Sequence, residues 1–232
     1  MTPMIMNPFR FGSVAAASTE FTSMYESRSA LTTVQKQHFV EWFSGSALNT
    51  DRWATHGSGT IAMANEVDGG LKITSATSGT TKIDFGSSDA LKKRPFSGSG
   101  CVMITVAQLT EVQYGIMTID LQDHYLTEVG DSVNSVVYGN LNGASGSQEK
   151  FKLVSTEFAN IDLSIATSQL YLEHVHKLEL KSASTELSID GVLEATGGAS
   201  ITLGVQPGLE ASAAEGAAAS IANFRYCEVY NT

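Results

Sequence analysis

The chain has 232 residues and a formal net charge of −10, from 24 acidic and 14 basic side chains. This balance excludes the wrapping of nucleic acid, which requires clustered Lys and Arg; the one basic run, Lys92-Lys93-Arg94, is typical of a solvated loop. Hydrophobic residues make up 42% of the chain and charged residues only 16%, which predicts a folded protein with a sizeable core and a largely neutral surface.

Residues 1–37 show no sustained strand periodicity, and we expect them to form a non-globular arm ahead of a single domain over residues 38–232. The arm carries large apolar side chains that so short a segment cannot bury by itself. We therefore expect it to dock on a neighbouring copy or another protein during assembly, through Met4, Ile5, Met6, Phe9, Phe11 and Phe21.

The first residues also bear on location. The start MTPMIMNPFRFGSV lacks a basic leader and places Arg10 where a signal peptide would be apolar, and the chain contains no run of about 18 apolar residues. We expect a protein made in the cytoplasm, with neither a signal peptide nor a membrane span.

From His38 onward, short β-rich runs alternate with turn signals. The runs are Thr60–Ala64, Leu71–Thr74, Val102–Val106, Tyr114–Ile119, Val133–Tyr138, Phe151–Ser155, Leu187–Ile189 and Ile221–Tyr230. Asn142-Gly143 and Asp190-Gly191 predict tight hairpin turns, with Gly191 at positive φ. Small residues, together with Gly208 and Gly216, predict an irregular loop over Leu209–Ser220. The spacing of the runs predicts an all-β antiparallel sandwich or jelly roll.

Several of these motifs together resemble concanavalin A-like lectin and glucanase domains of the laminin-G-like type. They are Phe43-Ser-Gly with a following Trp53, His174-Val-His176-Lys-Leu-Glu-Leu, Leu187-Ser-Ile-Asp190-Gly191-Val and Phe224-Arg-Tyr-Cys-Glu-Val-Tyr. The resemblance runs from about His38 to the end of the chain. It implies a jelly roll in which the first strand lies beside the last one.

In such a fold Trp42 or Phe43, together with Trp53, would seal one edge of the sandwich. Adjacent strand residues point to opposite faces, so one of Trp42 and Phe43 would lie in the core and the other would be covered by the arm or a partner. The alternative interpretation is a pair of tryptophans that stack on sugars.

Two groups of residues have the chemistry of metal ligands. His174 and His176 share a strand face, but Leu178 and Leu180 lie on the same face, which favours an inward, hydrogen-bonded His176 over a metal site. Asp120, Asp123 and Asp131 predict an acidic loop that is either solvated or bound to calcium. Cys101 and Cys227 lie in apolar runs as small buried side chains, and a disulfide between them stays open.

No catalytic motif is evident. The Glu-x-Asp-x-x-Glu run of the related glucanases is absent, as are nucleophile elbows and phosphate loops. We therefore expect a non-enzymatic protein without a cofactor. The resemblance, the neutral surface and the arm favour a structural virion protein, a phage capsid decoration or tail-accessory subunit that forms homo-oligomers and contacts other capsid or tail proteins. The alternative is a carbohydrate-binding or adhesion module that recognises a surface glycan.

Overall fold

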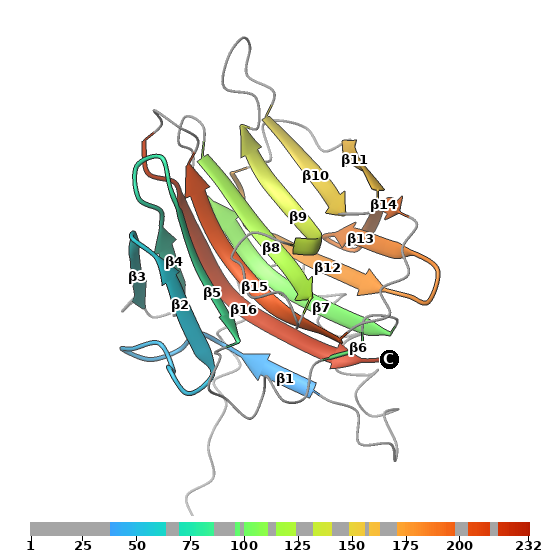
Figure 1. Cartoon of the computed structure of the whole chain (residues 1–232), viewed down its shortest axis with the longest axis horizontal. Coiled ribbons are helices and arrows are strands. Elements are labelled where there is room, and N and C mark those ends of the chain that lie inside the picture. Colours follow the sequence, from blue (N-terminus) through green and yellow to red (C-terminus); the bar gives the residue numbers. More distant parts are fainter. Residues whose placement is uncertain are drawn as a thin grey trace, which may run out of the picture. The chain divides into compact units, whose positions relative to one another are not determined.

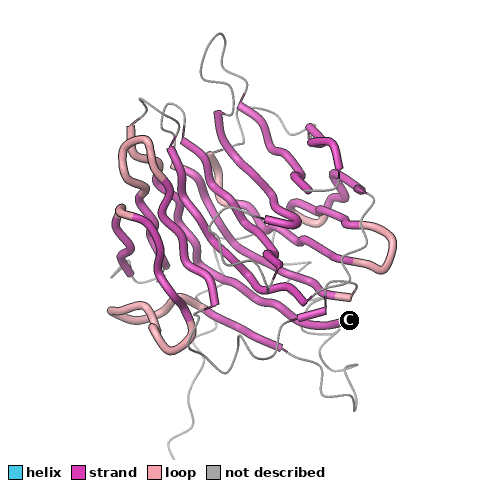
Figure 2. Tube along the Cα trace, in the orientation of Figure 1, coloured by secondary structure: helices cyan, strands magenta, loops and turns pink. Residues whose placement is uncertain are grey.

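The computed structural model describes residues 38–63, 70–85, 96–97, 100–110, 115–123, 132–140, 149–155, 158–162, 171–197, 204–213 and 218–232. The predicted arm over residues 1–37 and the Asn142-Gly143 turn lie outside these ranges. The described part contains sixteen β-strands and no helix (Figures 1 and 2). All strand pairs are antiparallel, and they form two sheets of eight strands each. The predicted all-β jelly-roll sandwich is confirmed.

The first sheet, sheet A, contains the first and last described strands. Its order is β14-β13-β12-β7-β16-β4-β3, with β1 paired to β16. Its strands are β1 His38–Glu41, β3 Thr60–Met63, β4 Leu71–Thr74, β7 Cys101–Leu109, β12 His174–Leu180, β13 Thr185–Ile189, β14 Val192–Gly197 and β16 Ile221–Asn231. As the resemblance implies, the first strand lies beside the last, with His38 opposite Tyr230.

The second sheet, sheet B, has the order β11-β10-β9-β8-β15-β5-β2, with β6 paired to β15. Its strands are β2 Trp53–Gly57, β5 Thr80–Phe85, β6 Phe96–Ser97, β8 Gly115–Asp123, β9 Ser132–Asn140, β10 Glu149–Ser155, β11 Phe158–Asp162 and β15 Gly204–Ala213. Figure 1 shows the two layers, with β15 and β8 lying over β16 and β7.

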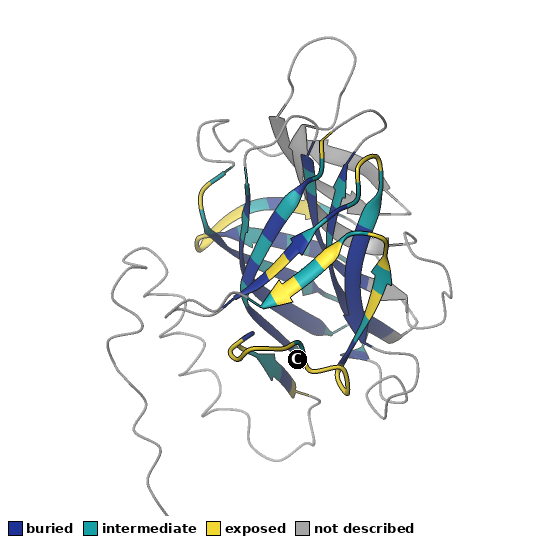
Figure 3. Cartoon of the chain, turned by 90° about the vertical axis from the view of Figure 1, so that its left-hand side faces the viewer, coloured by how far each residue is buried: buried dark blue, intermediate teal, exposed yellow. Residues whose placement is uncertain are grey.

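The core fills the space between the sheets, and buried residues follow the central strands, while exposed ones lie in turns and on the edge strands β3 and β14 (Figure 3). At one end of the core, aromatic rings join β1 to β2 and β5. The Phe39 ring centroid lies 5.5 Å from that of Trp53 and 4.6 Å from that of Phe85, and the Phe43 centroid lies 5.7 Å from that of Trp53. Trp53 is only 1% exposed, so it has the predicted structural role, and the alternative of two sugar-stacking tryptophans is wrong.

Trp42 and Phe43 separate as their positions predict. Phe43 is 1% exposed, whereas Trp42 is 44% exposed and lies on the other face of sheet A. The Trp42 ring centroid is 4.5 Å from that of Tyr226 on β16. Phe224, two residues earlier, is buried in the core between the sheets.

The Asp190-Gly191 hairpin is present between β13 and β14. Asp190 has φ 50° and Gly191 has φ 85°, so Gly191 lies in the predicted left-handed region. The Asp190 side chain holds the neighbouring strand as well, because its Oδ1 accepts a hydrogen bond from the Val175 N–H at 2.9 Å and its Oδ2 lies 2.7 Å from His174 Nδ1.

The predicted irregular loop over Leu209–Ser220 is wrong for its first half. Residues up to Ala213 belong to β15, in which Leu209, Ala211 and Ala213 are buried on the core side. β15 is a central strand of sheet B, paired with β8 on one side and with β5 and β6 on the other, and its small side chains pack on the core side. Alternation with period two, not residue size, is the signal for this strand.

Both cysteines are buried and free. Burial raises the pKa of the Cys101 thiol and that of the Cys227 thiol well above the usual range, which keeps them as inert core side chains.

Candidate functional site

The face of sheet B that points away from the core carries a group of charged side chains, which we call the polar cluster. Its members come from four adjacent strands: His56 on β2, Lys82 and Asp84 on β5, Glu210 on β15 and Asp120 on β8. The residues that alternate with them, among them Ile83, Ile119 and Leu209, lie in the core.

Lys82 and Asp120 form the buried centre of the polar cluster. Lys82 Nζ donates a hydrogen bond to Asp120 Oδ2 at 3.3 Å, and both side chains are fully buried. Removing two charges from water is costly unless they are paired, so each residue depends on the other. Lys82 also lies directly opposite Glu210 in the sheet.

Glu210 is the member whose protonation is shifted. Burial raises its pKa, and the nearby negative charge of Asp120 raises it further, while Lys82 and a hydrogen bond with Ser212 lower it; the net result is a pKa of about 7. Glu210 is only partly buried, so it remains within reach of a ligand. A carboxyl with this pKa can donate or accept a proton near neutral pH.

Asp84 supplies another carboxylate to the same face. Its Oδ1 lies 3.0 Å from Nε2 of His56, and the His56 side chain is 36% exposed. In the register of the sheet, Asp84 lies opposite Gly208 on one side and Asp120 lies opposite Gly208 on the other. Glu210 is two residues along from Gly208, so it is the diagonal neighbour of both aspartates, at a backbone separation of about 7–8 Å.

The arrangement therefore places three carboxyl groups around a glycine that contributes no side chain. Within the described ranges, no group of three or more His, Cys, Asp or Glu is placed to hold a metal ion. The cluster has groups that can move protons, because Glu210 has a pKa near neutrality and Asp84 is its diagonal neighbour in the sheet.

Asp120 was predicted on an acidic loop, and that interpretation is wrong. It lies within β8, where it pairs with Lys82. Asp123 is the last residue of β8, its side chain is outside the described part, and Asp131 is wholly outside it.

Sequence reasoning missed His56, Lys82, Asp84 and Glu210. The available signal was the presence of charged residues inside apolar β-rich runs, such as TTKIDF and GLEAS.

The two histidines of β12 are not arranged as metal ligands. His174 pairs with Asp190. Burial alone would raise the pKa of Asp190, but its hydrogen bonds with His174 and the Val175 N–H, together with the charge of the nearby histidines, lower that pKa below its usual value. His176 is 1% exposed, and burial lowers its pKa to about 3, against smaller opposing effects of Asp190 and a backbone hydrogen bond with Thr105. His176 is thus an inward, neutral side chain.

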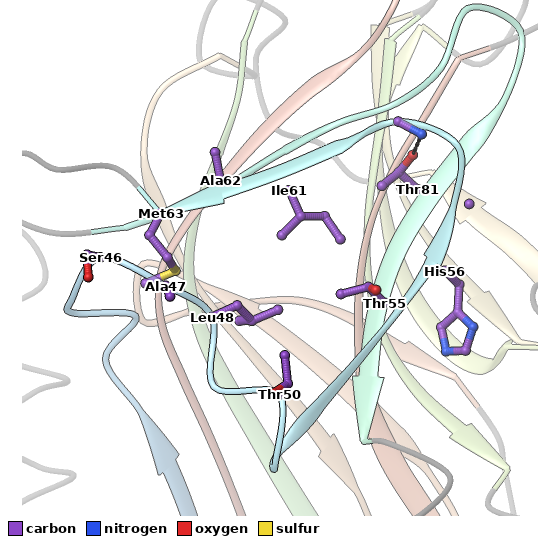
Figure 4. A pocket seen from close by; sticks show the side chains of 12 residues that line it. Ser46, Ala47, Leu48, Thr50, Thr55, His56, Ile61, Ala62, Met63 and Thr81 are labelled. Atoms are coloured by element: carbon purple, nitrogen blue, oxygen red, sulfur yellow. Dashed lines mark hydrogen bonds between the residues drawn. The ribbon is translucent and has the colours of Figure 1, made fainter.

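A separate pocket of about 610 Å³ opens between β2 and β3 at the edge of the sandwich (Figure 4). Leu48, Ile61 and Met63 supply apolar lining, and Thr50 and Thr55 supply hydroxyl groups. No carboxylate is among the described residues that line it. The pocket therefore shares His56 with the polar cluster but lacks the carboxyl groups of that cluster.

Comparisons with known proteins agree with the fold. No family model and no curated protein sequence matches the chain. A solved GH16 enzyme of Bacteroides ovatus, in complex with a G4G4G3G product, matches with a TM-score of 0.59 and 11% identity, over 82% of this chain and 99% of that one. A Crh5 transglycosylase matches with a TM-score of 0.58 and 15% identity, over 84% of each chain.

A third structure comes from work on endo-acting O-glycanases by which human gut microbiota initiate mucin breakdown. It matches with a TM-score of 0.58 and 15% identity, over 84% of this chain and 98% of that one. At these identities the likeness establishes the fold, a concanavalin A-like jelly roll.

The same comparisons overturn two expectations from the sequence. The three matching structures named above come from work on enzymes that act on glycans, which contradicts the expectation of a phage capsid or tail subunit and that of a protein without enzymatic activity. A further observation bears on location: within the described ranges, no helix has the length and apolar character needed to cross a membrane.

Proposed function

We propose that this chain is a carbohydrate-active domain that cleaves glycosidic bonds on the outer face of sheet B. The observation that carries the proposal is the placement of Glu210, Asp84 and Asp120 around Gly208 on this face, where burial and the charge of Asp120 raise the pKa of Glu210 to about 7. The carbohydrate-acting enzymes that share the fold support the same substrate class.

Hydrolysis of a glycoside requires a protonated acid at the leaving oxygen and a second carboxylate that acts as a base or nucleophile. In our proposal, Glu210 is the acid, because its raised pKa keeps the carboxyl protonated over part of the neutral range. Asp84 is the second carboxylate: it lies diagonally across from Glu210 on β5, and His56 holds one of its oxygens.

Lys82 and Asp120 have a positioning role. Both are fully buried, so they do not touch the substrate. Asp120 raises the pKa of Glu210, whereas Lys82 lowers it and also keeps the buried Asp120 charge paired. This layout differs from the Glu-x-Asp-x-x-Glu pattern, which puts both carboxylates on one strand. Here the proposed pair is divided between β5 and β15.

The second candidate is a carbohydrate-binding or adhesion module. The observation in its favour is the complete burial of Lys82 and Asp120, which a structural ion pair on a binding domain also explains. Both candidates bind glycans, and they differ only in whether a bond is broken.

The experiment measures the release of new reducing ends from a panel of neutral polysaccharides and mucin glycans. Wild-type protein should release product from at least one of them. Glu210→Gln should lower the rate by about 10²-fold or more, because it removes the proton donor. Glu194→Gln, on the edge strand β14, is the matched control and should keep the wild-type rate. Binding without product in the wild type would favour the adhesion module.

A further inference from the structure

The pocket between β2 and β3 lies where both sheets end. In strand order, β2 is the last strand of sheet B and β3 is the last strand of sheet A. Trp53 at the start of β2 points into the core, and Thr55, two residues further on, points to the same side but is exposed. The pocket is therefore a lateral opening of the sandwich, on the core side of β2.

The deeper part of the pocket is apolar. Leu48, Ile61 and Met63, which we call the apolar floor, are half-buried and pack against the hydrophobic core. Ile61 and Met63 lie opposite the core residues Ile73 and Leu71 of β4 in sheet A. Figure 4 shows Ile61 and Leu48 pointing into the same space from two sides. The floor is thus apolar surface at which the core meets the pocket.

Hydroxyl groups border the entrance of the pocket. Ser46, Thr50 and Thr55 line it and are exposed, so their hydroxyl groups can donate to a ligand and accept from it. Among the described lining residues, His56 alone has an ionisable side chain, and its ring points away from this space toward Asp84 on the outer face (Figure 4). The rim of the pocket is therefore polar but uncharged.

Tight backbone packing fixes the spacing of the two pocket walls. The Gly59 N–H, in the link between β2 and β3, donates a hydrogen bond to Thr81 Oγ1 at 2.9 Å. A Cβ atom at Gly57 would collide with the Thr80 carbonyl oxygen, and one at Gly59 would collide with that of Thr74. Because this link is packed against β4 and β5, the pocket is preformed, which lowers the entropy cost of binding.

We propose that this pocket binds an uncharged amphiphile, with an alkyl chain on the apolar floor and a hydroxylated head at the rim. Its volume of about 610 Å³ lies within the roughly 300–1,000 Å³ of small-molecule sites. The floor favours a chain that leaves water, and a charged group placed there would lack a partner. No Trp, Tyr or Phe is among the described lining residues, so a sugar without a chain would have no ring to stack on.

This inference goes beyond the proposed function and does not depend on it. The pocket opens on the core side of β2, whereas Glu210 and Asp84 lie on the outer face of sheet B. A ligand can therefore occupy the pocket in a variant that has lost the proposed proton donor.

The test titrates the wild-type protein with methyl, butyl, hexyl and octyl 1-thio-β-D-glucosides in a calorimeter, each below its critical micelle concentration. The thioglycosidic bond resists hydrolysis, so cleavage does not interfere. Affinity should rise by about two- to fourfold for each added methylene, and the methyl compound should show no saturable binding. Octyl sulfate has the same chain and a charged head, and it should bind more weakly than the octyl thioglucoside, because the protein has a net charge of −10.

Two variants address the pocket itself. Leu48→Ser makes the floor polar, and Thr55→Trp fills the space from an exposed strand position that accepts an aromatic residue. Each should weaken binding of the octyl thioglucoside by about tenfold or more. The matched controls are Leu193→Ser and Val192→Trp, at exposed positions of β14 on the opposite edge of sheet A.

Both controls and Glu210→Gln should bind as the wild type does, and circular dichroism with thermal melts checks the fold of every variant. Affinity that does not rise with chain length, or no saturable binding of the octyl thioglucoside, would overturn the inference. So would undiminished affinity in both pocket variants, or tighter binding of octyl sulfate. Self-association of the wild type that Thr55→Trp abolishes would overturn it too, because the pocket would then serve a second copy of the chain.

Discussion

At the scale of single residues, Glu210 couples the stability of the fold to its chemistry. It lies opposite Lys82 and diagonally from Asp120, and its pKa is raised from 4.5 to about 7. A carboxyl with a higher pKa in the folded state binds its proton more tightly there than in the unfolded chain. Its contribution to stability is therefore complete below about pH 4.5 and is lost as the pH rises through about 7.

We expect Glu210→Gln to remove this dependence. Glutamine cannot ionise, so the variant should gain on the order of 2–3 kcal/mol relative to the wild type between about pH 5 and pH 8. Urea unfolding at several pH values measures the difference. Glu194→Gln should follow the wild type. A constant offset between Glu210→Gln and the wild type across this range would show that Glu210 has an ordinary pKa.

Trp53 lies at the centre of the aromatic cluster at one end of the core. Its ring contacts those of Phe39, Phe43 and Phe85, so truncation would leave a large cavity between the sheets. We predict that Trp53→Ala costs about 3–5 kcal/mol of unfolding free energy. Trp42→Ala, which truncates a side chain that is 44% exposed, should cost about 1 kcal/mol. Equal costs for the two variants in denaturant melts would contradict the assignment of Trp53 to the core.

At the scale of elements, the β13–β14 hairpin depends on backbone conformation. Asp190 and Gly191 both have positive φ, which a β-branched residue resists. Gly191→Val should therefore lower the melting temperature and cost about 1–3 kcal/mol of unfolding free energy. Gly191→Asn is the control, since asparagine tolerates this region, and it should cost less. Equal melting temperatures for Gly191→Val and Gly191→Asn would show that the turn accommodates valine without an energetic cost.

Eight of the sixteen described strands overlap the β-rich runs of the sequence, because alternation and turn residues are local signals. Leu71–Thr74 is a strand with the predicted bounds, and Asp190-Gly191 turns where its chemistry predicts. The second half of β15 was predicted as a loop, because its small buried side chains, Ala211 and Ala213, give no clear strand signal. The error shows that a buried strand in the middle of a sheet can lack large side chains.

The polar cluster could not be predicted in the same way. Its residues come from β2, β5, β8 and β15, which are far apart in the chain and become neighbours only through the order of strands in sheet B. Strand order depends on long-range pairing, for which a single sequence carries no local signal. Charged residues within apolar runs mark the candidates, but not which of them meet.

At the scale of the whole molecule, β1 and β16 close sheet A and tie the start of the described chain to its end. We propose that the domain boundary lies near residue 37. A chain that begins at His38 should fold by itself, with β-type circular dichroism and a cooperative melt, because it retains both sheets and the core between them. Insolubility of this chain, beside stable full-length protein, would show that residues 1–37 contribute to the core.

The central claim is that Glu210 donates a proton to a glycosidic oxygen on the outer face of sheet B. The most direct test is the pH dependence of kcat/KM for the polysaccharide that the wild type cleaves best. Since the acid must be protonated, the rate should fall as the pH rises through about 7, and Glu210→Gln should lack activity on both sides of this value. A rate that stays level up to about pH 9, or a Glu210→Gln profile equal to that of the wild type, would contradict the claim.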